Sequence, residues 1–306
     1  MFGDFSLPVQ YILWPLLGFA VTQVSVNIGH DAIHGAYSNK KWVNDLLSHT
    51  FNFNGASAYM WHRMHNIAHH TYTNVDGFDG DIEPFPLIRI SPYAKYLKIH
   101  KYQKYYAYFF YCFATLSWVF GKDYVKFFQN KVGNFDGKDH PKREYFLLFL
   151  YKAIYYTLFI VVPFVFIEQP WYHILAGFFL MHFVSGFFLA SVFMLAHAME
   201  PVEFDKPTEE GDLRETFLAH QLRTTANFST KNPLAAFITG GLNTQIEHHL
   251  FPNICSCHYP AISDIVKATA KEFNEPYYDL NFSDAMTSHN KFLADMGDPK
   301  FALAEK

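Results

Sequence analysis

The chain has 306 residues, of which 50% are hydrophobic, 19% aromatic and only 17% charged. This composition excludes a disordered chain, because it supplies ample apolar surface to bury. A net charge of -4 leaves no basic surface for nucleic acid, and three cysteines cannot build a disulfide framework. The mean hydropathy of -0.02 fits a chain that lies partly in a membrane and partly in water.

Three long apolar runs, at residues 8–28, 145–167 and 172–196, contain almost no charged side chains. A helix needs about 20 residues to cross a bilayer core, so each run is long enough to span it. Only residues 168–171 separate the second run from the third, and this turn contains a proline and a tryptophan. We therefore expect these two runs to form a hairpin of membrane helices. The alternative is that all three runs are buried helices of a soluble protein.

Lysine and arginine are concentrated between the first and second runs, so the positive-inside rule places residues 30–144 and 197–306 in the cytoplasm. Residues 105–120 are apolar and aromatic but too short to span. They are predicted to form an interfacial or buried helix that lines a tunnel or simply belongs to the core. Because the chain shows no linker or internal repeat, we expect residues 1–306 to form one all-α domain. Its three membrane helices would carry a cytoplasmic helical cap that holds a di-metal site.

Histidine is frequent, with 17 residues, and it is clustered. The clusters are HDAIH at 30–34, HNIAHH at 65–70 and QIEHH at 245–249, while His197 ends the last apolar run. Residues four apart share one face of a helix, which pairs members within each cluster. All of these positions lie in cytoplasmic segments or at cytoplasmic ends of spans, so we expect them to converge. Their eight imidazoles are too many for one ion, which takes about four to six ligands, and they suit two.

The sequence leaves the identity of the metal open. It contains neither the His-Glu-x-x-His of many zinc enzymes nor the Glu-x-x-His of carboxylate-rich di-iron bundles. Imidazole suits iron, copper, nickel and zinc alike, so ligand spacing alone does not choose among them. A pair of redox metals that faces a membrane indicates O2 chemistry on a lipid.

The three clusters, in this order, resemble the histidine boxes of the membrane fatty acid desaturase family. The matching sequences are HDAIH, HNIAHH followed by TYTN, and QIEHHLFP. The third box carries Gln245 where many members have histidine, which is similar to the front-end and linoleoyl-CoA-type subgroup found in bacteria. The segments HQLRTTANFS at 220–229 and HYPAI at 258–262 also resemble that subgroup.

This resemblance implies an O2-dependent fatty acyl desaturase that introduces a cis double bond into an acyl chain linked to CoA or to a lipid. It implies two non-haem iron ions with O2 as co-substrate. The family's ligand positions match His30, His34, His65, His69, His70, His197, His248 and His249. We assign no catalytic residue beyond these ligands and no residue that binds another cofactor.

The chain differs from the family pattern in two ways. The family usually has four spans, two of them before the first box, whereas one precedes it here, so we expect an N-terminus short by one helix. The His-Pro-Gly-Gly motif of a fused cytochrome b5 domain is absent. The resemblance therefore implies a separate electron donor, either ferredoxin or cytochrome b5 with its reductase. It also favours a multi-pass protein of a bacterial inner membrane, in contact with membrane lipid and with a cytoplasmic active site.

Six further residues are predicted to be outer partners of the ligands or weak ligands. They are Asp31, Asn66, His220, Asn227, Gln245 and Glu247. An ordinary structural role is the alternative for each of them, such as a turn at Asn227. The acidic segment 76–83 lacks the register of a calcium loop, and we expect it to bind the polar end of a substrate or to support the site. His62 is expected at the surface, and His182, inside the last run, is expected to be a packing residue that is hydrogen-bonded.

Two other functions remain as alternatives at this point. A lipid hydroxylase or ketolase would use the same scaffold, and the sequence separates it poorly from a desaturase. A membrane metal transporter or metal-binding protein would need ionisable residues along a transmembrane path. The predicted spans offer little of this kind beyond Lys152, His173 and His182, which disfavours transport.

Overall fold

The computed structural model describes residues 5–82, 86–132, 135–136, 139–208, 212–213 and 215–303, and they are mostly helical. The N-terminal half contains α1 (Leu7–Val24), η1 (Ser25–Gly29), α2 (His30–Ile33), α3 (Lys41–Ser48), α4 (Thr50–Phe53), α5 (Ala58–Trp61), η2 (His62–His69), η3 (Lys98–Tyr102), α6 (Gln103–Tyr111), α7 (Ala114–Ser117), η4 (Trp118–Lys122), α8 (Asp123–Phe128), β1 (Lys131–Val132) and β2 (Phe135–Asp136). The C-terminal half contains α9 (Lys142–Tyr156), η5 (Thr157–Val161), α10 (Val162–Phe166), α11 (Trp171–His197), α12 (Phe217–Thr224), β3 (Asn227–Phe228), α13 (Pro233–Thr239), α14 (Gln245–Leu250), η6 (Ser256–His258), α15 (Tyr259–Glu272), β4 (Asp279–Leu280), α16 (Phe282–Met296) and η7 (Pro299–Phe301).

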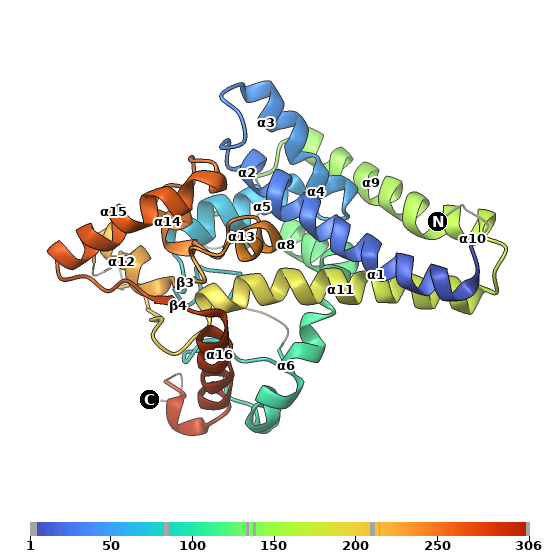
Figure 1. The fold of residues 1–306 in the computed structure, drawn as a ribbon. Helices are drawn as coiled ribbons and strands as arrows, with labels where there is room; N and C mark the ends of the chain where they lie inside the picture. The colour runs from blue at the N-terminus through green and yellow to red at the C-terminus, as the bar shows by residue number, and fades with distance from the viewer. Residues whose placement is uncertain are drawn as a thin grey trace.

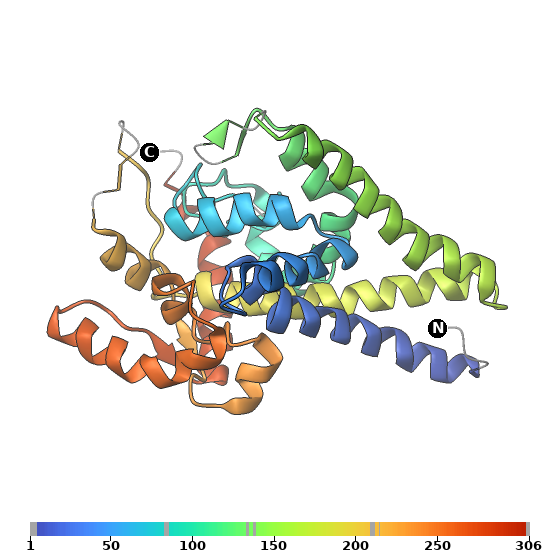
Figure 2. The same ribbon diagram turned by 90° about the horizontal axis from the view of Figure 1, so that it is seen from above.

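Three continuous helical rods are long and apolar enough to cross a membrane, as the sequence predicted. They are Leu7–Ile33, Lys142–Phe166 and Trp171–His197. The rods extend to one side of the molecule in Figures 1 and 2, while most of the shorter elements gather at the other end. Large apolar side chains such as Ile12, Phe146 and Val165 are exposed on them. Lipid would cover this surface in a membrane, so the protein is membrane-bound and all-α.

Glycine allows α1 and α11 to pack closely along much of their length. A Cβ atom at Gly18 would lie 2.1 Å from the carbonyl oxygen of Met181, and one at Gly177 would lie 2.2 Å from the indole nitrogen of Trp14. Small residues at such crossings let helix backbones approach each other inside a membrane. This contact holds α11 against α1, the helix that continues into α2.

The apolar segment 105–120 is divided into α6, α7 and η4, none of which is long enough to cross a membrane. This agrees with the predicted interfacial or buried position. The break after α6 lies against α11, where a Cβ atom at Gly186 would lie 2.5 Å from the carbonyl oxygen of Cys112. The segment therefore forms a wall beside α11, and a cavity lies between them.

Ionisable groups inside the rods are tied to neighbouring elements. His182 contacts Thr115 at 3.0 Å and Tyr155 at 2.8 Å through its two ring nitrogens, as expected for a packing residue. Lys152 donates to Asp123 at 2.8 Å and to the carbonyl oxygen of Gly55 at 2.7 Å. Both side chains are therefore occupied by hydrogen bonds. They are not available to line a path for ions through the membrane.

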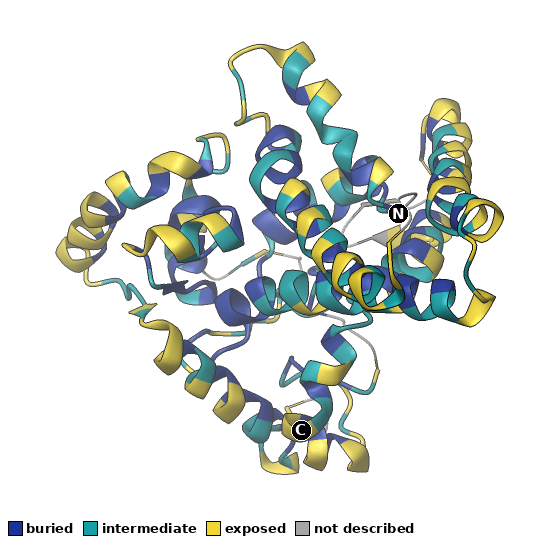
Figure 3. Ribbon diagram, turned by 45° about the vertical axis from the view of Figure 1, so that its right-hand side comes forward, coloured by how far each residue is buried: buried dark blue, intermediate teal, exposed yellow. Residues whose placement is uncertain are grey.

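The end opposite the rod tips contains most of the buried polar groups. Short strands β3 and β4 pair in parallel there, with Asn227 opposite Asp279 and Phe228 opposite Leu280. In Figure 3 the buried ribbon is concentrated where α11 and α14 meet the N-terminal helices, and the outer faces of the peripheral helices are exposed. The ends of four helical segments thus meet in the interior, and the histidine clusters lie on these ends.

Candidate metal centre

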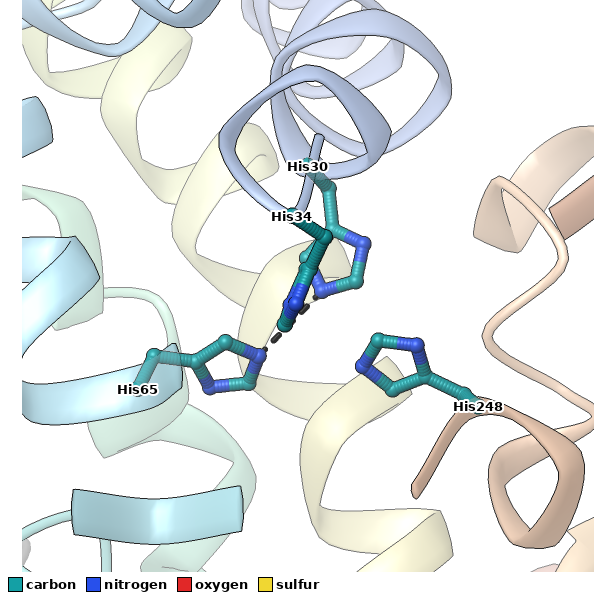
Figure 4. Close-up of side chains that lie close together, drawn as sticks. All are labelled: His30, His34, His65 and His248. Atoms are coloured by element: carbon teal, nitrogen blue, oxygen red, sulfur yellow. Dashed lines mark hydrogen bonds between the residues drawn. The ribbon is translucent and has the colours of Figure 1, made fainter. Parts of the chain in front are cut away.

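The structure brings the eight predicted histidines together in one buried cluster. They come from α2 and the residue after it, from η2 and the residue after it, from α11 and from α14. Each is at most 9% exposed, although the clusters lie far apart in the sequence. Figure 4 shows His30, His34, His65 and His248 pointing toward one another from three different segments.

The second cluster lies on a π-helix, and this differs from the α-helical spacing assumed from the sequence. In η2 the backbone N–H of His70 donates to the carbonyl oxygen of His65, five residues earlier. The wider turn of a π-helix brings residues five apart onto one face. As a result the ring centroid of His65 lies 5.1 Å from that of His69 and 4.8 Å from that of His70. His69 and His70 therefore both face the cluster. On an α-helix, His69 alone would share a face with His65.

The histidines form two groups. Within each group, the candidate ligand nitrogens all lie within 4.8 Å of one another. The four-histidine group contains His30, His34, His65 and His248. The three-histidine group contains His69, His197 and His249. His70 lies between them, with its ring centroid 4.7 Å from that of His34 and 4.3 Å from that of His249. The arrangement provides two adjacent sites of the size that metal ions require.

The nitrogens that face the interior have no hydrogen-bond partner among the described residues. These buried, unpartnered atoms are the Nε2 atoms of His34, His69, His70, His248 and His249. The Nε2 atoms of His30 and His65 face each other at 3.2 Å. Leaving so many buried polar atoms unpaired costs free energy, so a native protein retains them where another group satisfies them. A set of imidazole nitrogens fits metal ions as that group.

Short hydrogen bonds hold the outer nitrogens of two rings of the three-histidine group. His69 contacts the carboxylate of Asp79 through Nδ1 at 2.8 Å, and His249 contacts the amide oxygen of Gln221 through Nδ1 at 2.7 Å. In His197 the outer nitrogen, Nδ1, lies 3.4 Å from the carbonyl oxygen of Thr224, and the amide of Gln245 lies 2.9 Å from the inner nitrogen, Nε2. Such partners fix the tautomer and the orientation of a ring that binds a metal.

The outer contacts of the four-histidine group are longer. Nδ1 of His65 lies 3.6 Å from a carboxylate oxygen of Asp81, too far for a hydrogen bond, and Nδ1 of His248 lies 3.2 Å from the hydroxyl of Tyr259. Nδ1 of His30 lies 3.9 Å from Asp31, which is beyond hydrogen-bond distance. Asp31 instead accepts hydrogen bonds from the backbone N–H and hydroxyl of Ser256, both at 2.9 Å. These rings are therefore less firmly oriented than those of the other group.

Burial keeps most of these imidazoles neutral. It lowers the pKa of the rings outside the spans, and the neighbouring imidazoles lower it further for His34, His70, His248 and His249. Burial likewise lowers the pKa of His65 to about 3. Burial also lowers the pKa of His69, but the charge and hydrogen bond of Asp79 outweigh it, and the net shift is upward. Neutral rings can bind a metal without first losing a proton.

Three of the predicted outer residues organise the backbone around the cluster instead of contacting a ligand ring. Asn227 donates to Glu247 at 2.8 Å and accepts from the backbone N–H of Ile246 at 2.8 Å. Glu247 also accepts from the hydroxyl of Tyr277 at 2.8 Å. Asn66 donates to the carbonyl oxygen of Ile33 at 2.9 Å. These contacts fix α14 relative to β3 and η2 relative to α2.

His220 and His62 lie outside both groups. Nε2 of His220 lies 2.9 Å from the carbonyl oxygen of Thr73 and supports the segment after η2. His62 is exposed, as predicted. Sequence reasoning missed Gln221 and Tyr259 as partners of the ligands. Their signal was weak, because each lies within a segment that the resemblance matched but offers no motif of its own.

A large apolar cavity of about 1120 Å³ reaches the four-histidine group. His30, His65 and Gln245 line it at the cluster, and aromatic residues of segment 105–120 form part of its wall. Along α11 the lining runs from Leu175 to Met194. A polar cleft of about 1110 Å³ reaches the same group at His34. An apolar ligand can therefore approach the cluster from one side while polar groups approach it from another.

Comparison with known proteins gives a consistent match. A family model described as fatty acid desaturase matches residues 6–281. The chain is 34% identical over 300 residues to an sn-1 linoleoyl-lipid 6-desaturase of Synechocystis sp., covering 97% of this chain and 83% of that protein. It is 33% identical to an enzyme of the same name from Arthrospira platensis, covering 97% and 80%. An acyl-lipid (8-3)-desaturase of Physcomitrium patens is 33% identical, covering 96% of this chain and 61% of that protein.

Proposed function

The chain belongs to the fatty acid desaturase family, and from this premise we propose that it uses O2 and two iron ions to introduce a cis double bond into a lipid-linked acyl chain. It is a membrane-bound oxidoreductase with buried histidine clusters suited to metal. The observation that carries the proposal is the set of unpartnered imidazole nitrogens where an apolar cavity reaches the cluster. Metal ligands and an apolar space for an acyl chain are what the reaction needs in one place.

In this proposal each histidine group holds one iron. His30, His34, His65 and His248 would bind the first, and His69, His197 and His249 the second. His70, whose ring lies between the groups, would complete the ligand set. Imidazole is a suitable ligand for iron, and no cysteine belongs to either group among the described residues. Gln245, beside His197, is proposed as an outer partner of the second site.

Bound iron would supply the activation of O2 that removal of hydrogen from an unactivated methylene requires. The balanced reaction converts two neighbouring methylenes, O2, two electrons and two protons into a cis double bond and two waters. The protein's own share is to hold the chain and to keep water away. Phe110, Phe113 and Trp118 line the cavity and offer such an apolar path, so the chosen carbons can be placed beside the metals.

A lipid-linked substrate is favoured over an acyl-CoA by the position of the cavity. Several lining residues are exposed on the outer surface of the molecule, including Phe120, Phe164 and Phe179. Phe164 and Phe179 belong to the candidate spans, so that surface faces lipid. A chain that remains part of a membrane lipid could enter from the bilayer. The relatives from Synechocystis and Arthrospira are named for linoleoyl-lipid substrates, which supports the same choice.

The two electrons would come from a separate ferredoxin, or from cytochrome b5 with its reductase. We further propose that the metal centre faces the cytoplasm of a bacterial inner membrane. The distribution of lysine and arginine supports this orientation, because most of them lie either between the first two spans or after the third.

The test is a fatty-acid profile by gas chromatography and mass spectrometry. Host cells would express the chain or its His249→Ala variant, together with either donor. The proposal predicts a new cis-unsaturated species in the lipids of cells with the wild-type chain only. A hydroxylated or keto product would instead identify a lipid hydroxylase or ketolase, and the same new species with the variant would contradict the ligand assignment.

A further inference from the structure

Charge is distributed unevenly around the apolar cavity. Within the described part of the chain its lining contains the cations Lys122 and Lys126 and the anion Asp81. Lys122 ends η4, and Lys126 lies one helical turn later on α8, so they share a face. Phe164, Leu175 and Phe179, contributed by the spans, are apolar. The cavity therefore has one charged region and an apolar remainder, which is the pattern of an acyl chain with a polar end.

The charged region lies close to the metal centre. One oxygen of the Asp81 carboxylate lies 3.6 Å from Nδ1 of His65, and the other lies 2.9 Å from the ammonium of Lys122. Burial raises the pKa of Asp81, but Lys122 and the neighbouring histidines outweigh it and hold this pKa well below its usual range. The short contact at 2.9 Å pairs Asp81 with Lys122. A single carboxylate separates the ammonium of Lys122 from a proposed ligand.

The ammonium of Lys122 has donors to spare. Its side chain is 24% exposed and lies over the ring of Trp118, 5.4 Å from the centroid. Among the described residues it donates one hydrogen bond, to Asp81. An ammonium carries three N–H donors, so two can serve a ligand in the cavity. Asp81 holds the side chain in place, which lowers the entropy lost when it binds a further group.

We propose that Lys122 binds the carbonyl oxygen of the ester that links the acyl chain to its carrier, and so sets which carbons reach the metals. This inference rests on the proposed function and identifies a determinant of its specificity. The ester end lies at Lys122, only a few methylenes from the four-histidine group, and the methyl end extends along α7 and α11. The double bond consequently forms near the ester end of the chain. The relative from Synechocystis is named a 6-desaturase, which agrees with a bond near the ester end.

The test removes one side chain of the protein and one atom of the substrate, each alone and both together. Purified wild type and Lys122→Gln, each loaded with iron, receive the same lipid with either an ester-linked chain or an ether-linked chain that lacks the carbonyl oxygen. The position of the double bond and the KM are measured for each of the four combinations. Lys104→Gln is the matched control, because Lys104 also lies over an aromatic ring but is exposed and outside the cavity lining.

Wild type is expected to bind the ester-linked chain with a KM about tenfold below that of the ether, as for a hydrogen bond to a charged donor. Lys122→Gln is expected to have the same KM for the ester-linked and the ether-linked chain, equal to the KM of wild type for the ether-linked chain. Its product is expected to be a mixture of double-bond positions. Lys122→Arg should recover a single main position, and Lys104→Gln should match wild type.

Two outcomes would overturn the inference. One is that wild type handles ester and ether chains with equal KM and the same bond position. The other is that Lys122→Gln discriminates between the two chains as wild type does, and only its iron content or its kcat falls. Lys122 would then serve only to support Asp81. Failure of the proposed function would look different, because iron-loaded wild type would then give no desaturated lipid at all.

Discussion

The two histidine groups differ in how firmly their outer nitrogens are held. In the three-histidine group, Asp79 and Gln221 contact their rings at 2.8 Å and 2.7 Å. In the four-histidine group the corresponding contacts of Asp81 and Tyr259 are 3.6 Å and 3.2 Å. Of the two groups, the four-histidine group lines the apolar cavity, through His30 and His65. One half of the centre is thus rigidly built, and the other half faces the space for a substrate.

The largest expected effect comes from removing a proposed ligand from the rigid half. His69→Ala or His249→Ala should abolish desaturation, because each deletes one of the three nitrogens of that group. Product would be measured in the fatty-acid profile, with His62→Ala as a control because His62 is exposed and belongs to neither group. Full turnover by either ligand variant would show that the site is assigned wrongly.

A smaller loss is expected when an outer partner of the rigid half is changed. Asp79→Asn keeps the shape of the side chain but removes the charge that orients His69. Outer partners of metal-binding histidines typically contribute about 10–100-fold in affinity or activity, and a loss of this size is expected here. Iron content and kcat would both be measured. Asp45→Asn, in an exposed pair with Lys41, serves as the matched carboxylate control.

The equivalent change in the looser half, the four-histidine group, should lower activity by less. Tyr259→Phe removes the hydroxyl that lies 3.2 Å from His248, and we expect a loss of less than about tenfold. Measuring the two variants side by side tests the comparison itself. If Tyr259→Phe were as damaging as Asp79→Asn, the distinction between a rigid and a loose half would have to be abandoned.

Acid should destabilise the protein through a histidine outside both groups. His289 is buried between Tyr111 and the carbonyl oxygen of Ala198, and burial lowers its pKa to about 4. As pH falls through about 6.5, the unfolded chain takes up a proton that the folded chain still excludes. Stability is therefore lost between about pH 6.5 and pH 4, by roughly 2 kcal/mol at pH 5.

Thermal unfolding in detergent at pH 7.5 and pH 5 measures this loss, with His289→Gln as the comparison. The variant should show a flatter dependence on pH than wild type. If the variant showed the same pH dependence as wild type, the acid sensitivity would have to come from the two histidine groups and not from His289.

Part of this architecture could be read from the sequence. The three spans follow from the length of the apolar runs, since burial in lipid depends on length and polarity more than on detailed contacts. The convergence of the clusters was predicted from the expectation that all of them lie on one side of the membrane, at span ends or in segments between the spans. The first span continues to Ile33, beyond the predicted end at residue 28, because η1 continues the helix directly into the HDAIH cluster.

Other features depend on contacts that no local pattern records. The π-helix over His62–His69 changes which histidines share a face, and a spacing rule for α-helices does not reveal it. Gln221 contacts His249 across 28 residues of sequence, and Asp79 reaches His69 only because the chain turns back after η2. The acidic segment at 76–83 was expected to support the site or to bind a substrate. Residue 83 lies outside the described residues, and within the rest of the segment Asp79 and Asp81 lie beside His69 and His65, two proposed ligands.

The most direct test of a two-iron centre is the number and kind of metal ions in the purified protein. We expect about two iron ions per chain, one for each histidine group, by elemental analysis and Mössbauer spectroscopy. His34→Ala, in the looser group, and His249→Ala, in the rigid group, should each lower that number. A wild-type chain that holds a single ion, or that retains zinc in place of iron, would contradict the two-iron centre.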